Sequence, residues 1–109
     1  NAGTNAIKIL QRLVTRMGFP ASDDGMIGPA TIRAAGQADL AAPGYFADAY
    51  GIARRNYYYA LGDARPASRK YARSKAGGKG GWITRAEEFI SAGYHLTAAE
   101  HRARVAKWA

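Results

Sequence analysis

The sequence contains no cysteine among its 109 residues. Disulfide bonds and thiolate metal sites are therefore excluded, and the redox compartment stays open. No apolar run approaches the roughly 20 residues that a membrane-spanning helix needs, and the first residues do not have the pattern of a secretory signal peptide. The length is typical of one domain, so we expect a single domain over residues 1–109. Because the chain begins Asn-Ala-Gly-Thr without a methionine, we also expect a fragment of a longer protein.

Acidic residues are scarce: 8 Asp and Glu stand against 16 Lys and Arg, which gives a formal charge of +8. The imbalance is greatest between residues 65 and 85, where no acid accompanies the cations Arg65, Arg69, Lys70, Arg73, Lys75, Lys79 and Arg85. Such a surplus favours polyanionic partners, which include nucleic acid, anionic lipid and a bacterial wall rich in carboxylates and phosphates. Solubility alone is the simpler explanation of the net charge, and a solvated loop is the simpler explanation of the basic stretch.

Alternating apolar and polar residues of strand length are also absent, and helical spacing predominates. We predict helices over residues 5–17, 29–36, 44–61 and 82–93, a short helix within 66–74 and a last helix from 97 to 108. A linker is expected at 39–43 and a flexible glycine-rich loop at 77–81. The predicted fold class is therefore all-α, a small helical bundle with a three-helix core, a long tyrosine-rich helix and C-terminal helices.

The apolar spacing also predicts which side chains form the core. The expected core positions are Ile7, Leu10, Leu13 or Val14, Met17, Ile32, Ala35, the stripe Phe46, Tyr50, Ala53, Tyr57 and Leu61, and then Trp82 or Ile83, Ala86, Phe89 and Ile90. Gln11 and Glu87 are assigned to polar faces. Thr4 and the capping box Thr97–Glu100 are expected to start helices, Gly93 is expected to end one, and Val105 and Trp108 are expected to dock the last one.

The stretch from Asp24 to Thr31, Asp-Gly-Met-Ile-Gly-Pro-Ala-Thr, combines two turn signals with a helix start. Asp-Gly favours a tight turn because glycine tolerates positive φ. Pro29 suits the first turn of a helix, where its missing N–H costs nothing. Met26 and Ile27 lie between these signals, so we expect at least one of them to plug the core. The turn N–H groups and helix N-terminus could also line a ligand site, although such turns are structural first.

These residues carry a resemblance to bacterial peptidoglycan-binding domains. The matching residues are Leu10-Gln11-Arg12-Leu13, Gly18-Phe19, Asp24-Gly25, Ile27-Gly28-Pro29 and Thr31, followed in the same order by Tyr57-Tyr58, Arg65 and Gly81–Glu87. Over roughly residues 5–93 the chain resembles the domain that follows the catalytic domain in glycoside hydrolase family 108 muramidases, which include phage-type endolysins and muramidases of typhoid toxin release. The resemblance implies non-catalytic wall binding in the bacterial envelope (periplasm or cell wall), beside a catalytic partner domain that cleaves the β-1,4 bond between N-acetylmuramic acid and N-acetylglucosamine.

The candidate ligand-binding residues are aromatic and basic. Arg54, Tyr57 and Tyr58 are spaced i, i+3 and i+4, so they are neighbours on a helix. Aromatic rings pack against the C–H faces of sugars, and arginine holds carboxylates of muramyl peptides. The full candidate set is Asp24, Arg54, Tyr57, Tyr58, Arg65, Lys79, Trp82 and Arg85. The simpler interpretation places the tyrosines and Trp82 in the core with wet polar tips.

The sequence offers little for catalysis. The family's N-terminal Glu-Gly-Gly segment is missing, since no Glu occurs before Glu87. Glu87 and Glu88 are adjacent on a helix and point about 100° apart, so they do not face each other across a substrate. His95 and His101 lack the spacing of a catalytic or metal site, and we expect no cofactor and no metal. The alternatives left open are a small basic nucleic-acid-binding domain and a minimal enzyme with Glu87 or Glu88 as the acid.

Overall fold

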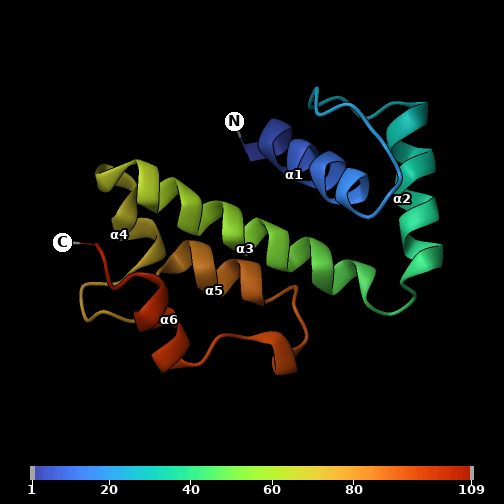
Figure 1. Ribbon diagram of the computed structural model, residues 1–109. Coiled ribbons are helices and arrows are strands. Elements are labelled where there is room, and N and C mark those ends of the chain that lie inside the picture. Colours follow the sequence, from blue (N-terminus) through green and yellow to red (C-terminus); the bar gives the residue numbers. More distant parts are fainter. Residues whose placement is uncertain (1, 109) are drawn as a thin grey trace. The chain divides into compact units, whose positions relative to one another are not determined.

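The computed structural model describes residues 2–108, and over that range it is helical without a strand. The elements are α1 (Ala2–Arg16), α2 (Pro29–Ala41), α3 (Phe46–Ala64), η1 (Pro66–Ser68), α4 (Arg69–Ala72), α5 (Gly81–Glu87), η2 (Ala92–Tyr94) and α6 (Ala98–Arg104) (Figure 1). The all-α prediction is confirmed. Several boundaries differ. In the first half of the chain, α1 begins three residues early at Ala2, α2 runs on to Ala41 through the expected linker, and α3 runs three residues further, to Ala64. Towards the C-terminus, α5 ends at Glu87, six residues before the expected end at Gly93, and α6 ends at Arg104, four residues before the expected end at residue 108. None of the helices between residues 2 and 108 has the length and hydropathy of a membrane span.

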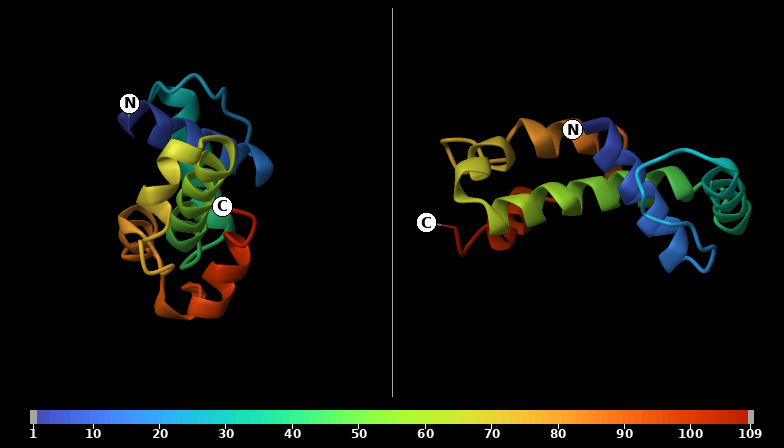
Figure 2. Two further views of the ribbon diagram at one scale, coloured as in Figure 1. Left: turned by 90° about the vertical axis from the view of Figure 1, so that its left-hand side faces the viewer. Right: turned by 90° about the horizontal axis from the view of Figure 1, so that it is seen from above.

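The chain divides into two compact units, unit 1 within residues 1–53 and unit 2 within residues 54–109. In unit 1, α1 packs against α2. In the right-hand view of Figure 2, α2 is seen nearly end-on whereas α1 runs across the view. Val14, Ala34 and Ala38 form the buried core of this unit, and the partly buried side chains packed on it are Leu10, Met17, Phe19, Ala21 and Phe46. The apolar spacing predicted for α1 is therefore confirmed for Val14 and Leu10.

Gln11 is the hydrogen-bonding centre of unit 1, and its prediction as a solvent-facing residue was wrong. Its side chain is fully buried, and Gln11 Nε2 lies 3.0 Å from Asp24 Oδ1, from the Met26 carbonyl oxygen and from Thr31 Oγ1. The Gly25 N–H donates to Gln11 Oε1 at 3.0 Å. Gln11 thus ties α1 to the turn and to the first residues of α2 through a set of contacts that an apolar side chain cannot make.

The Asp24–Gly25 turn is confirmed, because Gly25 has φ of 75° and a Cβ there would lie 2.5 Å from Thr4 Cγ2. Pro29 is the first residue of α2, as predicted. The expected apolar plug is wrong: Met26 is 70% exposed and Ile27 62% exposed. The turn is held by the polar contacts of Gln11, so it needs no apolar anchor.

Two further predictions in unit 1 are corrected. Ile32 is exposed, because α2 buries Thr31, Ala34 and Ala38 and so turns Ile32 toward solvent. Thr4 lies inside α1, which begins at Ala2, and is not an N-cap.

Unit 2 is built around Tyr59, Ala72, Ile83, Val105 and Trp108. Figures 1 and 2 both show α5 running beside the second half of α3. Ile83, Ala86 and Ile90 are buried as predicted, and Val105 and Trp108 dock the end of the chain. A Cβ on Gly62 would lie 2.4 Å from Trp108 Cη2. The Trp108 ring can therefore pack against α3 only because residue 62 has no side chain.

The predicted stripe on α3 has the wrong register. The buried positions of this helix are Asp48, Gly51, Arg55, Tyr59 and Gly62. Among the three consecutive tyrosines, Tyr59 alone is buried, and Tyr57 and Tyr58 are partly exposed, which agrees with the argument that three adjacent rings cannot all be core. The register differs because two buried residues, Arg55 and Tyr59, are paired with polar partners on other elements.

Local signals near the C-terminal end have mixed outcomes. The capping box is confirmed, since Thr97 and Glu100 exchange hydrogen bonds at the start of α6. Gly93 lies within η2 and does not end α5. The glycine-rich segment predicted as a flexible loop forms a hydrogen-bonded turn in which the Ser74 N–H donates to the Gly78 carbonyl at 2.8 Å and the Gly80 N–H donates to the Ala72 carbonyl at 2.9 Å.

Candidate ligand-binding site

Four aromatic side chains of unit 2 gather beside α5: Tyr57, Tyr58, Tyr71 and Trp82, which we call the aromatic cluster. The ring centroid of Trp82 lies 5.0 Å from that of Tyr58 and 5.0 Å from that of Tyr71, with the planes inclined by 30° and 31°. Tyr57 meets Tyr58 edge-on at 5.8 Å. Tyr71 is 47% exposed and the other three are partly exposed. The cluster therefore combines rings held against one another with side chains that remain partly exposed.

Arg54 lies at the edge of the aromatic cluster. Its Nη2 donates to Tyr58 Oη at 3.3 Å, and its guanidinium carbon lies 6.0 Å from the ring centroid of Phe89, which is 64% exposed. The buried Arg54 Nε has no hydrogen-bond partner among residues 2–108. Arg54 thus places a positive charge next to the rings, together with an N–H group that has no hydrogen-bond acceptor among residues 2–108.

The structure brings together four of the predicted ligand residues, Arg54, Tyr57, Tyr58 and Trp82. Arg85 is exposed and lies three residues after Trp82, on the same side of α5, and Arg65 is exposed between α3 and η1. Sequence reasoning missed Tyr71 and Phe89: Tyr71 lies in the short helix expected within 66–74, where attention went to the cations around it, and Phe89 was assigned to the core.

The other two predicted residues are engaged in holding the fold. Lys79 contacts the buried carboxylate of Glu87 and donates to the Leu96 carbonyl. Asp24 belongs to unit 1, where the Met26 N–H and the Gln11 side chain bond to its carboxylate and lower its pKa. A carboxylate already committed to a turn has less capacity for a ligand.

Glu87 has the environment of a structural carboxylate. Its Oε2 accepts from Arg55 Nη1 at 2.7 Å and from the Leu96 N–H at 2.8 Å, and Lys79 contacts Oε1. Burial raises the pKa of Glu87, but the hydrogen bonds from Lys79, Leu96 and Arg55 outweigh it and leave the pKa below the usual value. A general acid needs a raised pKa, so these contacts disfavour the minimal-enzyme interpretation for Glu87.

The two histidines, His95 and His101, make hydrogen bonds to residues outside the aromatic cluster. His101 is fully buried with Nδ1 2.7 Å from Tyr59 Oη, and burial lowers the pKa of this imidazole. Burial also raises the pKa of Tyr59 to about 12. His95 Nε2 lies 2.7 Å from the Ile90 carbonyl oxygen. Within the described range, no three residues of the metal-ligating types come together.

Residues 5–87 of the chain match the family described as a predicted peptidoglycan domain. The matched range contains the Gln11-held turn, the whole of α3 and the aromatic cluster. Comparisons with curated proteins and with solved structures gave no significant match. The family match supports peptidoglycan binding, and domains of this kind are generally non-catalytic. Since it covers more than half of the chain, the chain belongs to the predicted peptidoglycan domain family.

Proposed function

We propose that the chain binds bacterial peptidoglycan through the aromatic cluster and Arg54, and that it targets an attached muramidase to the wall. The observation that carries the ligand site is the contact of Trp82 with both Tyr58 and Tyr71, three side chains that remain partly exposed. Aromatic rings held in this way suit the apolar C–H faces of the glycan. Arg54 supplies charge and hydrogen-bond donors for the carboxylates or amides of the same polymer.

The muramidase part of the proposal rests on the resemblance to the C-terminal domain of glycoside hydrolase family 108 enzymes. The residues that carry it are Tyr57-Tyr58, Arg65 and Gly81–Glu87, in the order found in those proteins. Tethering a catalytic domain to a wall-binding domain raises its effective concentration at the substrate without adding chemistry. The setting would be the bacterial envelope.

Nucleic-acid binding, the other function considered from the sequence, is not favoured. The helix pair that could imitate a helix-turn-helix is α1 and α2, and α2 offers Arg33 as its one basic residue. Unit 1 as a whole has four basic and four acidic residues, so it carries no net positive charge to attract phosphates.

The test is co-sedimentation of the chain with purified, nucleic-acid-free sacculi at low and high salt. We expect binding that survives high salt and releases no sugar fragments. A Tyr58→Leu/Trp82→Leu variant keeps an apolar side chain at both positions but loses both rings, so its affinity should fall about tenfold, as for a loss of roughly 1.5 kcal/mol. Tyr45→Leu, which removes an exposed ring of unit 1, is the matched control.

Because Tyr58 and Trp82 also pack on the core of unit 2, circular dichroism must show that the double variant is folded. A second variant, Tyr71→Leu, removes a more exposed ring and should weaken binding in the same direction. Binding that disappears at high salt, or that is equal in all variants, would contradict the aromatic cluster as the ligand site.

A further inference from the structure

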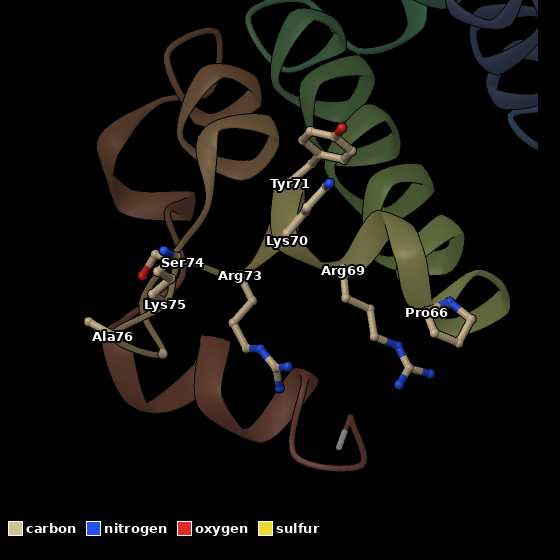
Figure 3. Close-up of a pocket in the computed structure, with 9 residues that line it drawn as sticks. Pro66, Arg69, Lys70, Tyr71, Arg73, Ser74, Lys75 and Ala76 are labelled. Atoms are coloured by element: carbon tan, nitrogen blue, oxygen red, sulfur yellow. The ribbon is translucent and has the colours of Figure 1, made fainter.

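The hollow beside η1 and α4 does not form a convergent site. Figure 3 shows the side chains of Arg69 and Arg73 on one side of this segment and those of Lys70 and Tyr71 on the other. Both arginines donate hydrogen bonds to backbone carbonyls of unit 2. They are thus engaged within the fold, and the surface that still lacks a partner is in unit 1.

The outer face of α2 carries apolar side chains that unit 1 leaves in water. Ile32 is 62% exposed and Leu40 is 83% exposed, and Gly36 lies midway between them, four residues from each. Residues four apart share one side of a helix, so these three positions form one stripe, which we call the α2 seam. Figure 1 shows α1 on one side of α2 and, among the described residues of unit 1, no helix on the opposite side. The α2 seam is therefore an apolar face without a partner.

The fold of unit 1 does not explain why residue 36 is a glycine. A Cβ at Gly36 would meet no atom within 4 Å, and the residue lies inside α2 without a positive φ. Neither lack of space nor backbone conformation thus requires glycine, although glycine in a helix interior destabilises the helix relative to alanine. A glycine at the centre of an exposed stripe does allow a second helix backbone to come close. The α2 seam therefore has the shape of a helix-packing surface.

The two charged residues of α2 flank this surface symmetrically. Arg33 and Asp39 each lie three residues from Gly36, one before it and one after it. Within residues 2–108 neither of them forms an ion pair. Asp39 also lies in the last turn of α2, where the helix dipole disfavours a negative charge. One copy of the chain therefore gives neither charge a partner.

A second copy of α2 accounts for the apolar stripe, the glycine and the charges together. In an antiparallel pair centred on Gly36, Ile32 is level with Leu40 of the second copy, and Arg33 is level with Asp39 of the second copy. Both contacts occur twice, because a two-fold interface is self-complementary. Parallel pairing would instead place each charge level with its own counterpart. The charges therefore select the antiparallel arrangement.

The distribution of charge also favours contact through unit 1. This unit has four basic and four acidic residues, so two copies that meet there carry no net charge at the contact. Unit 2 has twelve basic and four acidic residues, and it carries the whole formal charge of +8. Two copies meeting through unit 2 would repel each other.

We propose that the chain forms an antiparallel homodimer through the α2 seam, with reciprocal ion pairs between Arg33 and Asp39. One helix pair covers less area than a permanent dimer needs, so the dimer is reversible, with a dissociation constant on the order of 100 µM. This inference does not depend on wall binding, since the aromatic cluster lies in unit 2. Where the proposed function holds, a dimer brings two aromatic clusters to one polymer and raises avidity.

Sedimentation equilibrium of the whole chain, from tenfold below to tenfold above the expected dissociation constant, tests the dimer. We expect the mass to rise from one copy to two. Gly36→Gln places a long side chain at the closest approach and should weaken dimerisation about tenfold. The same variant should have a slightly higher melting temperature where wild type is monomeric, because glutamine favours helix. Ala30→Gln adds the same side chain at an exposed position of α2 outside the seam and should dimerise like wild type.

Charge exchange tests the antiparallel register. Arg33→Asp and Asp39→Arg each replace two attractions by two repulsions, so each should weaken dimerisation about tenfold. The exchanged variant Arg33→Asp/Asp39→Arg again places opposite charges level with each other. Its dissociation constant should return to within about threefold of the wild-type value.

Three results would overturn the inference. The first is a chain that stays monomeric at every concentration; if Leu40→Gln then weakens binding to sacculi, the α2 seam contacts the wall polymer instead. The second is a dimer that Gly36→Gln leaves intact, since such a dimer uses another surface. The third is failure of the charge exchange to restore affinity. Loss of sacculus binding in an intact dimer would remove the proposed function and leave this inference standing.

Discussion

Arg55 on α3 and Glu87 on α5 form an ion pair that is almost completely shielded from water. Arg55 Nη1 lies 2.7 Å from Glu87 Oε2, and the two side chains are 7% and 4% exposed. Lys79 and the Leu96 N–H bind the same carboxylate, and Arg55 also donates to the Tyr94 carbonyl at 2.9 Å. One buried carboxylate thus joins α3, the glycine-rich turn, α5 and the segment before α6.

Replacing Glu87 by Gln should destabilise the domain strongly. The change keeps the shape of the side chain but leaves Arg55 and Lys79 with no negative partner, and breaking a buried pair from one side costs about 3 kcal/mol or more. Urea unfolding should show a lower midpoint at an unchanged slope. Glu88→Gln, at the neighbouring exposed position, should stay within about 0.5 kcal/mol of wild type. A stable Glu87→Gln variant would mean that the carboxylate is not the structural centre of unit 2.

Replacing Gln11 by Leu should destabilise unit 1. The change removes the donor and the acceptor that serve Asp24, Gly25, Met26 and Thr31, and leaves buried polar groups unsatisfied at a cost of about 1–3 kcal/mol. The matched control is Gln37→Leu at an exposed position of α2. Amide hydrogen exchange should show faster exchange of the Gly25 N–H in the Gln11 variant alone. Slow exchange there would contradict the assignment.

An acidic residue at position 27 should be tolerated. Because Ile27 is 62% exposed, Ile27→Asp places its charge in water, and we expect a change in the free energy of unfolding within about 0.5 kcal/mol. Val14→Asp is the contrasting variant: Val14 is fully buried, and an unpaired carboxylate there should prevent unit 1 from folding. Thermal melts followed by circular dichroism distinguish the two. Unfolding by Ile27→Asp would restore the discarded idea of an apolar plug.

His101 should make the domain less stable as the pH falls below its ordinary pKa of 6.5. Burial lowers the pKa of His101 and the charge of Lys79 adds to the effect, while the Gly78 backbone and Glu87 oppose it without reversing it. The unfolded chain therefore takes up a proton at a higher pH than the folded chain does, and the free energy of unfolding decreases with falling pH from about 6.5 downward. Glu87 and Glu100, whose pKa values lie below their ordinary 4.5, lose their contribution only at lower pH.

The check is the melting temperature of wild type and His101→Gln between pH 7 and pH 5. The variant should be less stable at pH 7, because it disturbs the contact with Tyr59 Oη, but its melting temperature should depend less on pH in this window. Equal slopes for the two proteins would show that His101 is not the group responsible.

The sequence predicted the parts of the fold that depend on neighbours along the chain. The capping box of Thr97 and Glu100 and the turn at Asp24–Gly25 are local, and both are present. The buried polar residues were missed because their partners are distant: Gln11 is 13 residues from Asp24, and Arg55 is 32 residues from Glu87. Periodicity assigns an isolated polar residue to the surface, since it carries no information on a remote partner.

The contacts of the candidate site also fall into local ones, which the sequence predicts, and distant ones, which it does not. Arg54 and Tyr58 are one helical turn apart, so their contact could be predicted from spacing. The contacts of Trp82 with Tyr58 and with Tyr71 depend on how α5 packs in unit 2, and no pattern in the sequence marks Tyr71. The fold class was therefore predictable, the helical half of the site was partly predictable, and the remainder required the tertiary structure.

Both tryptophans, Trp82 and Trp108, lie in unit 2, and unit 1 has none. Tryptophan fluorescence therefore reports on one half of the chain, whereas the far-ultraviolet signal of the helices reports on both. Fluorescence and ellipticity curves that coincide in urea would mean that the two units melt cooperatively, as expected of a single domain. Curves that separate would give each unit its own free energy and make the chain a pair of small folding units joined through α3.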